Sequence, residues 1–513
     1  MTFFETLLAL LLASVVLLQV ARRLSLPYPA MLAGAGVVVA LVPGAPNIPI
    51  EPATALPLFI APALVDAAYD FPPSAARRFW APLVAFALVA VLATAALVAG
   101  IGWAYAGLPL AAAVALGAIV APPDAAAATA VLSTVSIPRS TDAVLKGESL
   151  FNDATALLLF GAALAVQSNG GLDLGVGLRL ALAVPGGLGL GVAWALVVRR
   201  IDRLVTGTLG GNLLQFVNAF LVWIVAERLH LSAVLSTVAF AMTLARSAEV
   251  SGGARMRVHS YAVWSAVVFC LNVFAFLLMG MQARGIVARM EPAALTSALV
   301  FAGLVVLAVV VARLAVVVGY NRLTAWRYAR RGEPAPASLA QAVFVGWSGM
   351  RGLVTLATAF ALPEDFPQRD AVVLTAFGVV LATLVLQGLT LGPLIRWLDL
   401  DRGDAFGREL AEARATLAAT ALATIGTRAG PEADNLRYAY ALARDAAGDP
   451  SRTAPLERRR DLGLAAIAAQ RARLERMRLD HAVGADAYGM LQEELDWREL
   501  ALLPDDARRI EEG

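Results

Sequence analysis

Residues 147–160 read GESLFNDATALLLF, and this stretch decides how the rest of the chain is interpreted. Glu148, Asn152 and Asp153 stand at the start of a run that is otherwise apolar enough for a bilayer or a deep core. A charge at the centre of a membrane-spanning helix costs roughly 2.5–3.5 kcal/mol on insertion scales, so such residues are usually functional and usually have partners. The stretch therefore predicts a working site inside a membrane protein, if the flanking sequence is itself embedded.

The composition separates an apolar body from a polar tail. The 513-residue chain is 59% hydrophobic and only 16% charged, whereas soluble domains are about 25% charged. Of the 80 Asp, Glu, Lys and Arg residues, 38 lie in residues 401–513. We therefore expect an all-α membrane protein with a transmembrane domain over 1–400 and a cytoplasmic helical domain over 401–513.

Cysteine and histidine argue against a resident metal. Cys270 is the only cysteine, and His230, His259 and His481 are scattered along the chain. A zinc site needs several clustered thiolate or imidazole ligands. We expect no cofactor and no nucleic-acid partner, and the extent of apolar sequence excludes a soluble enzyme.

Thirteen stretches approach the roughly 20 mostly apolar residues that a spanning helix needs. They lie near residues 3–21, 28–44, 54–70, 79–100, 110–134, 144–166, 173–198, 212–227, 231–246, 261–281, 296–320, 340–362 and 371–397. The first has no basic segment before it, which is atypical of a cleaved signal peptide. We read it as a first span.

Loop charge sets the orientation. With a cytoplasmic tail and thirteen spans the N-terminus lies outside, the inner loops carry sixteen basic residues, and the outer loops carry only Arg228, Arg284, Arg289 and Arg369. This asymmetry follows the positive-inside rule. Fusing 212–227 with 231–246 would reverse every later loop, so two separate helices are expected there. We place the protein in a bacterial-type plasma (inner) membrane.

Charges recur near one depth in several spans. Asp153 lies two residues from the middle of 144–166, Asp124 two residues from the middle of 110–134, and Arg351 at the middle of 340–362. Arg313 lies about 7–8 Å from the middle of 296–320 at 1.5 Å per residue. A shared depth predicts that these side chains meet.

Two of these spans carry helix breakers. Pro122 and Pro123 precede Asp124 and remove two amide donors, and three glycines bracket Arg351, namely Gly346, Gly349 and Gly352. Paired interrupted spans are typical of transporters with a midplane binding site. Because the interrupted spans are the fifth and the twelfth, spans 1–6 and 8–13 would form two inverted six-helix repeats whose broken helices cross.

Each residue also has a purely structural interpretation. The two prolines would merely kink a helix, Glu148 and Arg313 would extend to the membrane surface, and Asp153 would make a structural hydrogen bond inside the bundle. Asp153 is too central to reach the surface easily.

The residues resemble a known family. ESLFNDATALLLF is similar to the Glu-Ser-Leu-x-Asn-Asp-Ala block of the sodium/proton exchangers, the Asn-Asp branch of the monovalent cation/proton antiporters. The resemblance continues in order over about residues 5–400. It is carried by APPDAAAATAVL (121–132), AERLHLSAVLSTVAFAM (226–242), LNVFAFLLMGMQ (271–282), GWSGMRGLVTLATAFALP (346–363) and TLVLQGLTLGPLIRWL (383–398).

The resemblance implies an electroneutral antiporter built as a homodimer of 13-helix subunits. By the resemblance, Asp153 binds cation and proton alternately and Asn152 marks the electroneutral branch. Asp124 faces a broken-helix end and helps to hold Asn152, and Ser149 lies near the ion. The remaining implied roles are Glu148 paired with a helix-borne arginine, here Arg313, and Arg351 as the arginine of the second broken helix.

One motif departs from the family. Many relatives have Thr-Asp-Pro at the first break, whereas this chain has Pro123-Asp124-Ala125. The threonine hydroxyl is gone, although the carbonyl of Pro123 would still face the ion. The oxygen ligands expected for the transported cation are then Asp153, Asp124, Ser149 and that carbonyl.

Competition for one desolvated carboxylate is sufficient for exchange. We expect Asp153 to hold either Na⁺ or Li⁺ or a proton, and to cross the membrane only when occupied, because bare charge resists the apolar barrier. K⁺/H⁺ exchange on the same scaffold is an alternative, as are a cation channel and a sodium-coupled solute carrier. Flux without counter-transport would identify a channel.

The tail predicts a helical hairpin. ERRRDLGLAAIAAQRARLERMRLD (457–480) has helical spacing with apolar positions at Leu462, Leu464, Ile467, Leu474 and Met477. ADAYGMLQEELDWRELALL (485–503) follows Gly484 as a second helix. A plain helical appendage is the simplest interpretation, with regulation or dimer support as alternatives.

Overall fold

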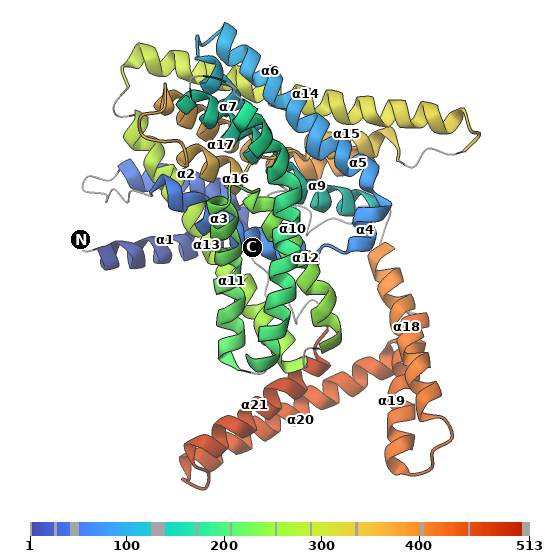
Figure 1. Ribbon diagram of the computed structural model, residues 1–513. Helices are drawn as coiled ribbons and strands as arrows, with labels where there is room; N and C mark the ends of the chain where they lie inside the picture. The colour runs from blue at the N-terminus through green and yellow to red at the C-terminus, as the bar shows by residue number, and fades with distance from the viewer. Residues whose placement is uncertain are drawn as a thin grey trace. The chain divides into compact units, whose positions relative to one another are not determined.

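The computed structural model describes residues 3–24, 28–41, 51–124, 139–169, 171, 174–205, 208–251, 254–287, 290–333, 337–400, 405–449 and 452–504. Within these ranges all regular structure is helical and no strand occurs (Figure 1). The chain divides into two compact units near residue 401, and each is described by itself.

The first unit is a bundle of helices. Their bounds are α1 (Phe3–Leu24), α2 (Tyr28–Leu41), α3 (Pro52–Asp70), α4 (Pro73–Arg78), α5 (Trp80–Val84), the π-helical turn η1 (Ala85–Ala90), α6 (Val91–Ala104), α7 (Leu110–Val120), α9 (Arg139–Asn169), α10 (Leu174–Val205), α11 (Leu209–Arg228), α12 (Ala233–Ser251), α13 (Ala254–Val287), α14 (Pro292–Ala329), α15 (Leu339–Trp347), α16 (Leu353–Phe360) and α17 (Arg369–Trp397).

Seven helical segments in the described ranges are long and apolar enough to cross a bilayer. They are Pro52–Asp70, Trp80–Ala104, Ser140–Ser168, Gly177–Ile201, Ser260–Leu278, Leu295–Ala329 and Arg369–Trp397. Shorter apolar helices include Leu110–Val120 and Ala233–Arg246. The stretches expected as two helices near 212–246 are indeed separate, because α11 ends at Arg228 and α12 begins at Ala233.

Both expected interruptions are present. α7 ends at Val120, ahead of the two prolines, and the chain is non-helical at Pro123 and Asp124. The rest of the expected span, 125–134, lies outside the described residues. In the second interruption α15 ends at Trp347 and α16 begins at Leu353. We call residues 121–124 the first break and residues 348–352 the second break.

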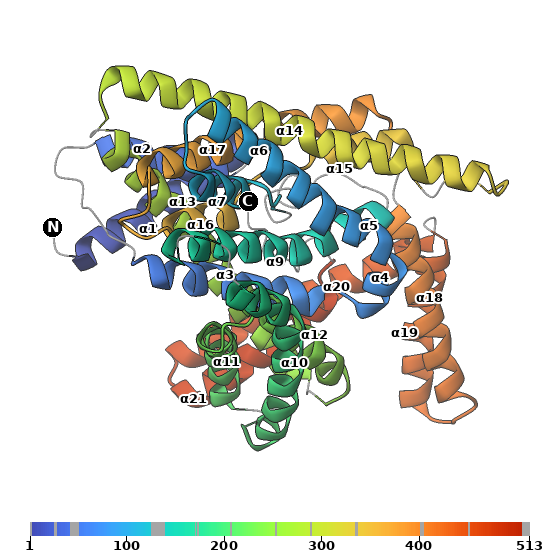
Figure 2. The ribbon, with the colours of Figure 1, turned by 45° about the horizontal axis from the view of Figure 1, so that its top comes forward.

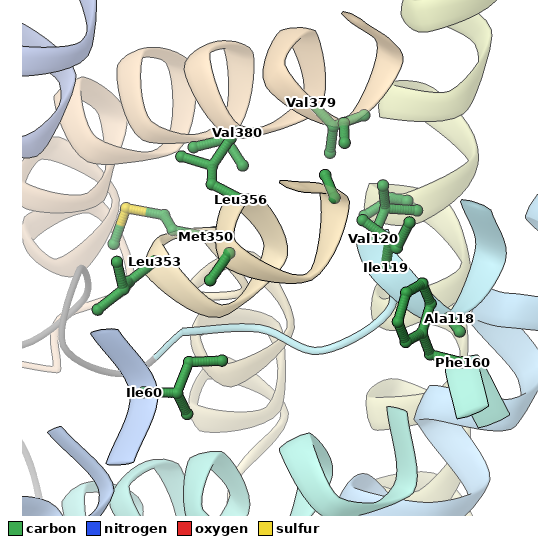
Figure 3. Packing of buried hydrophobic residues seen from close by; sticks show 14 of the residues in the cluster. Ile60, Ala118, Ile119, Val120, Phe160, Met350, Leu353, Leu356, Val379 and Val380 are labelled. Atoms are coloured by element: carbon green, nitrogen blue, oxygen red, sulfur yellow. The ribbon is translucent and has the colours of Figure 1, made fainter. Parts of the chain in front are cut away.

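The two breaks meet in the buried core. Figure 3 shows Met350 and Leu353 on the left of the view and Ile119 and Val120, at the end of α7, on the right, with Val380 and Val379 of α17 above. These five core residues, namely Ile119, Val120, Met350, Val379 and Val380, are at most 1% exposed. The interrupted backbone is therefore surrounded by apolar protein, which is the setting that non-helical backbone needs inside a membrane.

Glycines let helices approach backbone to backbone. A Cβ added to Gly36 of α2 would lie 2.3 Å from the Leu277 carbonyl of α13, and one added to Gly117 of α7 would lie 2.3 Å from the Ala95 carbonyl of α6. Gly191 of α10 has the same relation to Ser236 of α12. These three pairs lie side by side in both ribbon views (Figure 2). Small residues at helix contacts are the usual packing device in membranes.

The second unit consists of two helical hairpins. α18 (Ala405–Ile425) packs on α19 (Pro431–Gly448), and α20 (Ala454–Leu479) packs on α21 (Ala485–Leu502). The α20–α21 pair is the hairpin expected from the sequence. Ile467 and Leu474 pack with Leu495 in its core. Leu462 was expected on the same apolar stripe but is 73% exposed, so that part of the expectation is wrong.

Candidate functional site

α9 carries four polar side chains close together in sequence. Glu148, Asn152 and Asp153 are 1%, 0% and 3% exposed, and Ser149 is half-buried one turn before Asp153. The interpretation in which Glu148 extends to the membrane surface is wrong, since its side chain is fully enclosed. Polar groups this deeply buried usually have hydrogen-bond partners. The partner differs from one of these residues to the next.

Glu148 is neutralised by an arginine from another helix. Arg313 of α14 donates from Nη1 and Nη2 to its two carboxylate oxygens, at 2.5 and 3.1 Å. Nη2 of Arg313 also donates to the carbonyl of Val345 in α15, at 3.1 Å. This is the pairing expected from the sequence. A fork-to-fork contact of this kind fixes both side chains.

Asp153 is treated differently. Within the described part of the chain, no hydrogen bond or ion pair reaches its carboxylate, although it lies close enough to Asp124 for the two acids to interact as like charges. A strong bond to an arginine would neutralise Asp153 and leave it unable to bind a transported ion. No arginine among the described residues makes such a bond. Its carboxylate is thus buried beside a second acid.

Asn152 fastens α9 to the first break. Its Nδ2 donates to the carbonyl of Pro123, at 2.8 Å. The resemblance implies that Asp124 helps to hold Asn152, and this role stays a prediction. The described contact of Asn152 goes to the neighbouring carbonyl of Pro123, which is freed where α7 ends. The Pro123 oxygen that was expected to face the ion is engaged by this amide. Oδ1 of Asn152 is buried and has no partner.

Asp124 caps a half-helix of the second break. Its Oδ2 accepts from the amide of Leu353, the first residue of α16, at 3.0 Å. Its own amide donates to the carbonyl of Met350, at 2.7 Å. A carboxylate at a helix N-terminus satisfies an orphan donor and complements the helix dipole.

Arg351 makes the reverse connection. From the second break it donates through Nε to the carbonyl of Val120, at 3.0 Å, and through Nη2 to that of Ala121, at 3.2 Å. It also donates to the carbonyl of Gly349. It thereby satisfies the C-terminal carbonyls of α7 with a cation, which the dipole favours there. Each break thus caps the half-helix of the other.

Sequence reasoning missed the role of α17. The amide of Arg351 donates to Oγ1 of Thr383, at 3.1 Å, and Nε1 of Trp347 donates to Oγ1 of Thr390, at 2.9 Å. Both threonines lie in the block TLVLQGLTLGPLIRWL. Their spacing, together with Gln387 between them, is a polar stripe on an apolar helix and is the signal that would have found them.

A permanently bound metal ion needs a particular arrangement of ligand side chains. Among the described residues, no group of three or more His, Cys, Asp or Glu side chains is arranged to hold a metal ion. What the described geometry provides is one acid neutralised by arginine, two acids that interact as like charges, and several freed backbone groups.

Comparison with known proteins finds relatives that are named as cation/H⁺ antiporters or exchangers. A sodium, potassium, lithium and rubidium/H⁺ antiporter of Bacillus pumilus is 27% identical over 82% of this chain and 65% of its own length, so the chain spans just under two thirds of that protein. An uncharacterized Na⁺/H⁺ exchanger of Mycobacterium tuberculosis is 28% identical over 97% of this chain and 96% of its own length. The Na⁺/H⁺ antiporter NhaH of Halobacillus dabanensis is 31% identical over 57% and 70%, respectively.

The fold has a solved counterpart. The sodium proton antiporter MjNhaP1 of Methanocaldococcus jannaschii, at pH 8, superposes with a TM-score of 0.61 and 18% identity, covering 79% of this chain and all of that one. The protein is thus an all-helical membrane protein with that fold. The family described as "Sodium/hydrogen exchanger, transmembrane" matches residues 9–397. On that match the chain belongs to the sodium/hydrogen exchanger family.

Proposed function

We propose that this protein exchanges a monovalent cation, Na⁺ or Li⁺, for H⁺ across the membrane by alternating access. The observation that carries the proposal is the contrast between two acids on one helix. Glu148 is neutralised by Arg313, whereas Asp153 is 3% exposed and meets no cation among the described residues. Asp153 alone therefore has its charge available for a transported ion.

The chemistry of Asp153 permits two occupants. Burial disfavours a bare carboxylate, and the like charge of Asp124 disfavours it further. Binding of either a proton or a hard cation neutralises the negative charge of the carboxylate. Hard cations bind oxygen ligands. Ser149, one helical turn away, and the unpartnered Oδ1 of Asn152 supply further oxygens in the same region.

Competition for one site gives exchange. High cation concentration and high pH fill Asp153 with the cation, and lower pH fills it with a proton. The empty site carries uncompensated charge and resists crossing, so each direction of movement carries one occupant. Because the Glu148–Arg313 pair is already neutral, one cation exchanges for one proton, and the cycle is electroneutral.

The architecture that fits this proposal is the one expected from the sequence. We place thirteen spans in two inverted six-helix repeats over residues 1–400, with the N-terminus outside and residues 401–513 forming a cytoplasmic helical domain. A homodimer in a bacterial-type inner membrane completes it. The separate helices α11 and α12 and the two crossed breaks support this topology.

The test uses purified protein in vesicles with a trapped pH-sensitive dye. We expect Na⁺ or Li⁺ to drive proton movement, and the rate to be unchanged by a protonophore that collapses membrane potential. Asp153→Asn should abolish the signal with the folded protein retained. The matched control is Asp142→Asn, an exposed acid of the same helix paired with Lys146 at 3.0 Å, which should exchange normally. Wild-type rates in Asp153→Asn would overturn the proposal.

Potassium is the second candidate substrate. It is favoured by the Bacillus pumilus relative, whose name includes potassium and rubidium. The loss of the threonine hydroxyl before Asp124, where this chain has Pro123, removes one ligand from the first break. Comparing the three cations over a range of pH in the same vesicles decides between them, and ion flux without proton counter-flux would identify a channel.

A further inference from the structure

Gln387 of α17 is a fully buried amide that the exchange chemistry does not use. Its side chain is 0% exposed, and neither Nε2 nor Oε1 has a hydrogen-bond partner. A buried amide with both polar atoms unpaired is costly, because each loses its bonds to water. Such a residue in a membrane interior calls for a functional explanation.

The position of Gln387 is fixed by its neighbours on the helix. Thr383, Gln387 and Thr390 are spaced i, i+4 and i+7, so they form one stripe along α17. Thr383 accepts from the amide of Arg351, and Thr390 accepts from the indole of Trp347. The stripe therefore contacts the second break at its Thr383 end and the last residue of α15 at its Thr390 end. Gln387 lies on α17 between these two contacts.

The second break offers groups that match this amide. The main-chain amides of Gly349 and Met350 donate to no described residue, and Met350 is 0% exposed. The break therefore has two unpaired donors, the amides of Gly349 and Met350. Gln387 of α17 has one unpaired acceptor, Oε1, and one unpaired donor, Nε2. A single bound water can accept from both main-chain amides and donate to Oε1 of Gln387, and about three hydrogen bonds is the usual number for a buried water.

We propose that Gln387 is the positioning residue of the second break, acting on Gly349 and Met350 through one bound water. Two hydrogen bonds connect the second break to the exchange site. The carbonyl of Met350 accepts from the amide of Asp124, whose carboxylate caps α16 and acts on Asp153. Gln387 thus sets where the second acid lies, and with it the balance between cation and proton. This last step rests on the proposed function.

Replacement of the amide by an apolar side chain of similar volume tests this. Gln387→Met should raise the apparent KM for Na⁺ by about tenfold, the size of effect expected from losing one buried hydrogen-bond partner. The pH of half-maximal exchange should shift as well, with the maximal rate within about twofold, because only the position of Asp124 changes. Gln387→Asn, which keeps the amide, should give an intermediate KM.

A matched control lies on the same helix. Thr375 is also 0% exposed, but its hydroxyl donates to the Ala371 carbonyl of its own helix, at 2.7 Å. Thr375→Val should leave KM and the pH profile unchanged. Equal values for Gln387→Met and wild type, or the same change in Thr375→Val, would overturn the proposal.

Hydrogen–deuterium exchange separates this inference from the exchange function. Gln387→Met should speed amide exchange in peptides covering 345–356, and Thr375→Val should not. If the wild-type protein moves no cation at all, the proposed function fails, while the deuterium result still judges the role of Gln387. Unchanged deuterium uptake in Gln387→Met would remove the positioning role whatever the transport result.

Discussion

Glu148 and Asp153 lie five residues apart on one helix, but their charges have different surroundings. Glu148 has two bonds to Arg313, whereas Asp153 has the like charge of Asp124. A buried ion pair contributes little net stability, but removing one partner strands a charge. The two acids should therefore respond to substitution in different ways.

Arg313→Ala should destabilise the fold by about 3–5 kcal/mol, because Glu148 is left buried and uncompensated. Thermal unfolding in detergent measures this as a lowered midpoint. The double variant Glu148→Leu with Arg313→Met removes both charges and should regain most of the loss. If the single variant unfolds at the wild-type temperature, the pair is not the structural contact described here.

At this scale the sequence was sufficient for some residues. The pairing of Glu148 with Arg313 was implied by the resemblance to the sodium/proton exchangers, and the structure contains it. The depth of Asp153 in the membrane stays a prediction from counting along the spans. The target of Arg351 could not be predicted, because its partners Val120 and Ala121 lie about 230 positions earlier in the chain. Only the crossing of the two breaks brings them together.

At the scale of helices, the second break can be disturbed by one methyl group. A Cβ at Gly352 would lie 2.0 Å from Oδ2 of Asp124, and that flexible carboxylate would have to move off the start of α16. Gly352→Ala should therefore reduce exchange at least about tenfold, by the cost of one lost charge-assisted bond. The dye assay in vesicles measures it.

The control for Gly352→Ala is Gly161→Ala in α9, where a Cβ would meet nothing within 4 Å. Alanine is favoured over glycine inside a helix, so this variant should be as stable as wild type or more so, with normal exchange. A normal rate in Gly352→Ala would show that Asp124 need not cap α16.

The α20–α21 hairpin offers a matched pair of leucines. Leu474 is 7% exposed and packs against Leu495, whereas Leu462 on the same helix is 73% exposed. Leu474→Ala should destabilise the tail by about 2–3 kcal/mol, and Leu462→Ala by no more than about 0.5 kcal/mol. Proteolysis of the tail in the full chain measures the difference, and equal rates would contradict the packing.

Acid should loosen the same hairpin. Hydrogen bonds from Arg478, and from Tyr488 at 2.9 Å, hold the pKa of Glu475 below its ordinary value of 4.5. The stability from this contact is therefore present above pH 4.5 and is lost as the pH falls through the lower, folded pKa. Tyr488→Phe should weaken this dependence in acid proteolysis, while the neutral-pH rate changes little.

Helix boundaries were less predictable than helix positions. α14 continues to Ala329, nine residues beyond the apolar stretch ending at 320, because hydropathy falls before helical structure does. The π-helical turn Ala85–Ala90 leaves no mark in composition. The α18–α19 hairpin was not expected, since its polar surface gives little periodic signal, and helices of this kind are stabilised by packing.

At the scale of the whole molecule, all the site residues belong to the first compact unit. A chain ending at residue 401 should therefore keep cation/proton exchange within about twofold, because no bond of the site is removed. Vesicle exchange by this shortened protein measures it, with full-length protein as reference. Loss of exchange in a folded, monodisperse sample would assign the tail a direct part in transport.

The reciprocal capping of the breaks has a consequence for recombination between relatives. Asp124 comes from the first half of the membrane unit and serves a helix of the second, and Arg351 does the opposite. A chimera that takes one half from a protein lacking either residue would inherit a helix end with no counter-charge. The halves can be exchanged only between parents that both supply this acid and this guanidinium, because each half depends on a charged side chain of the other.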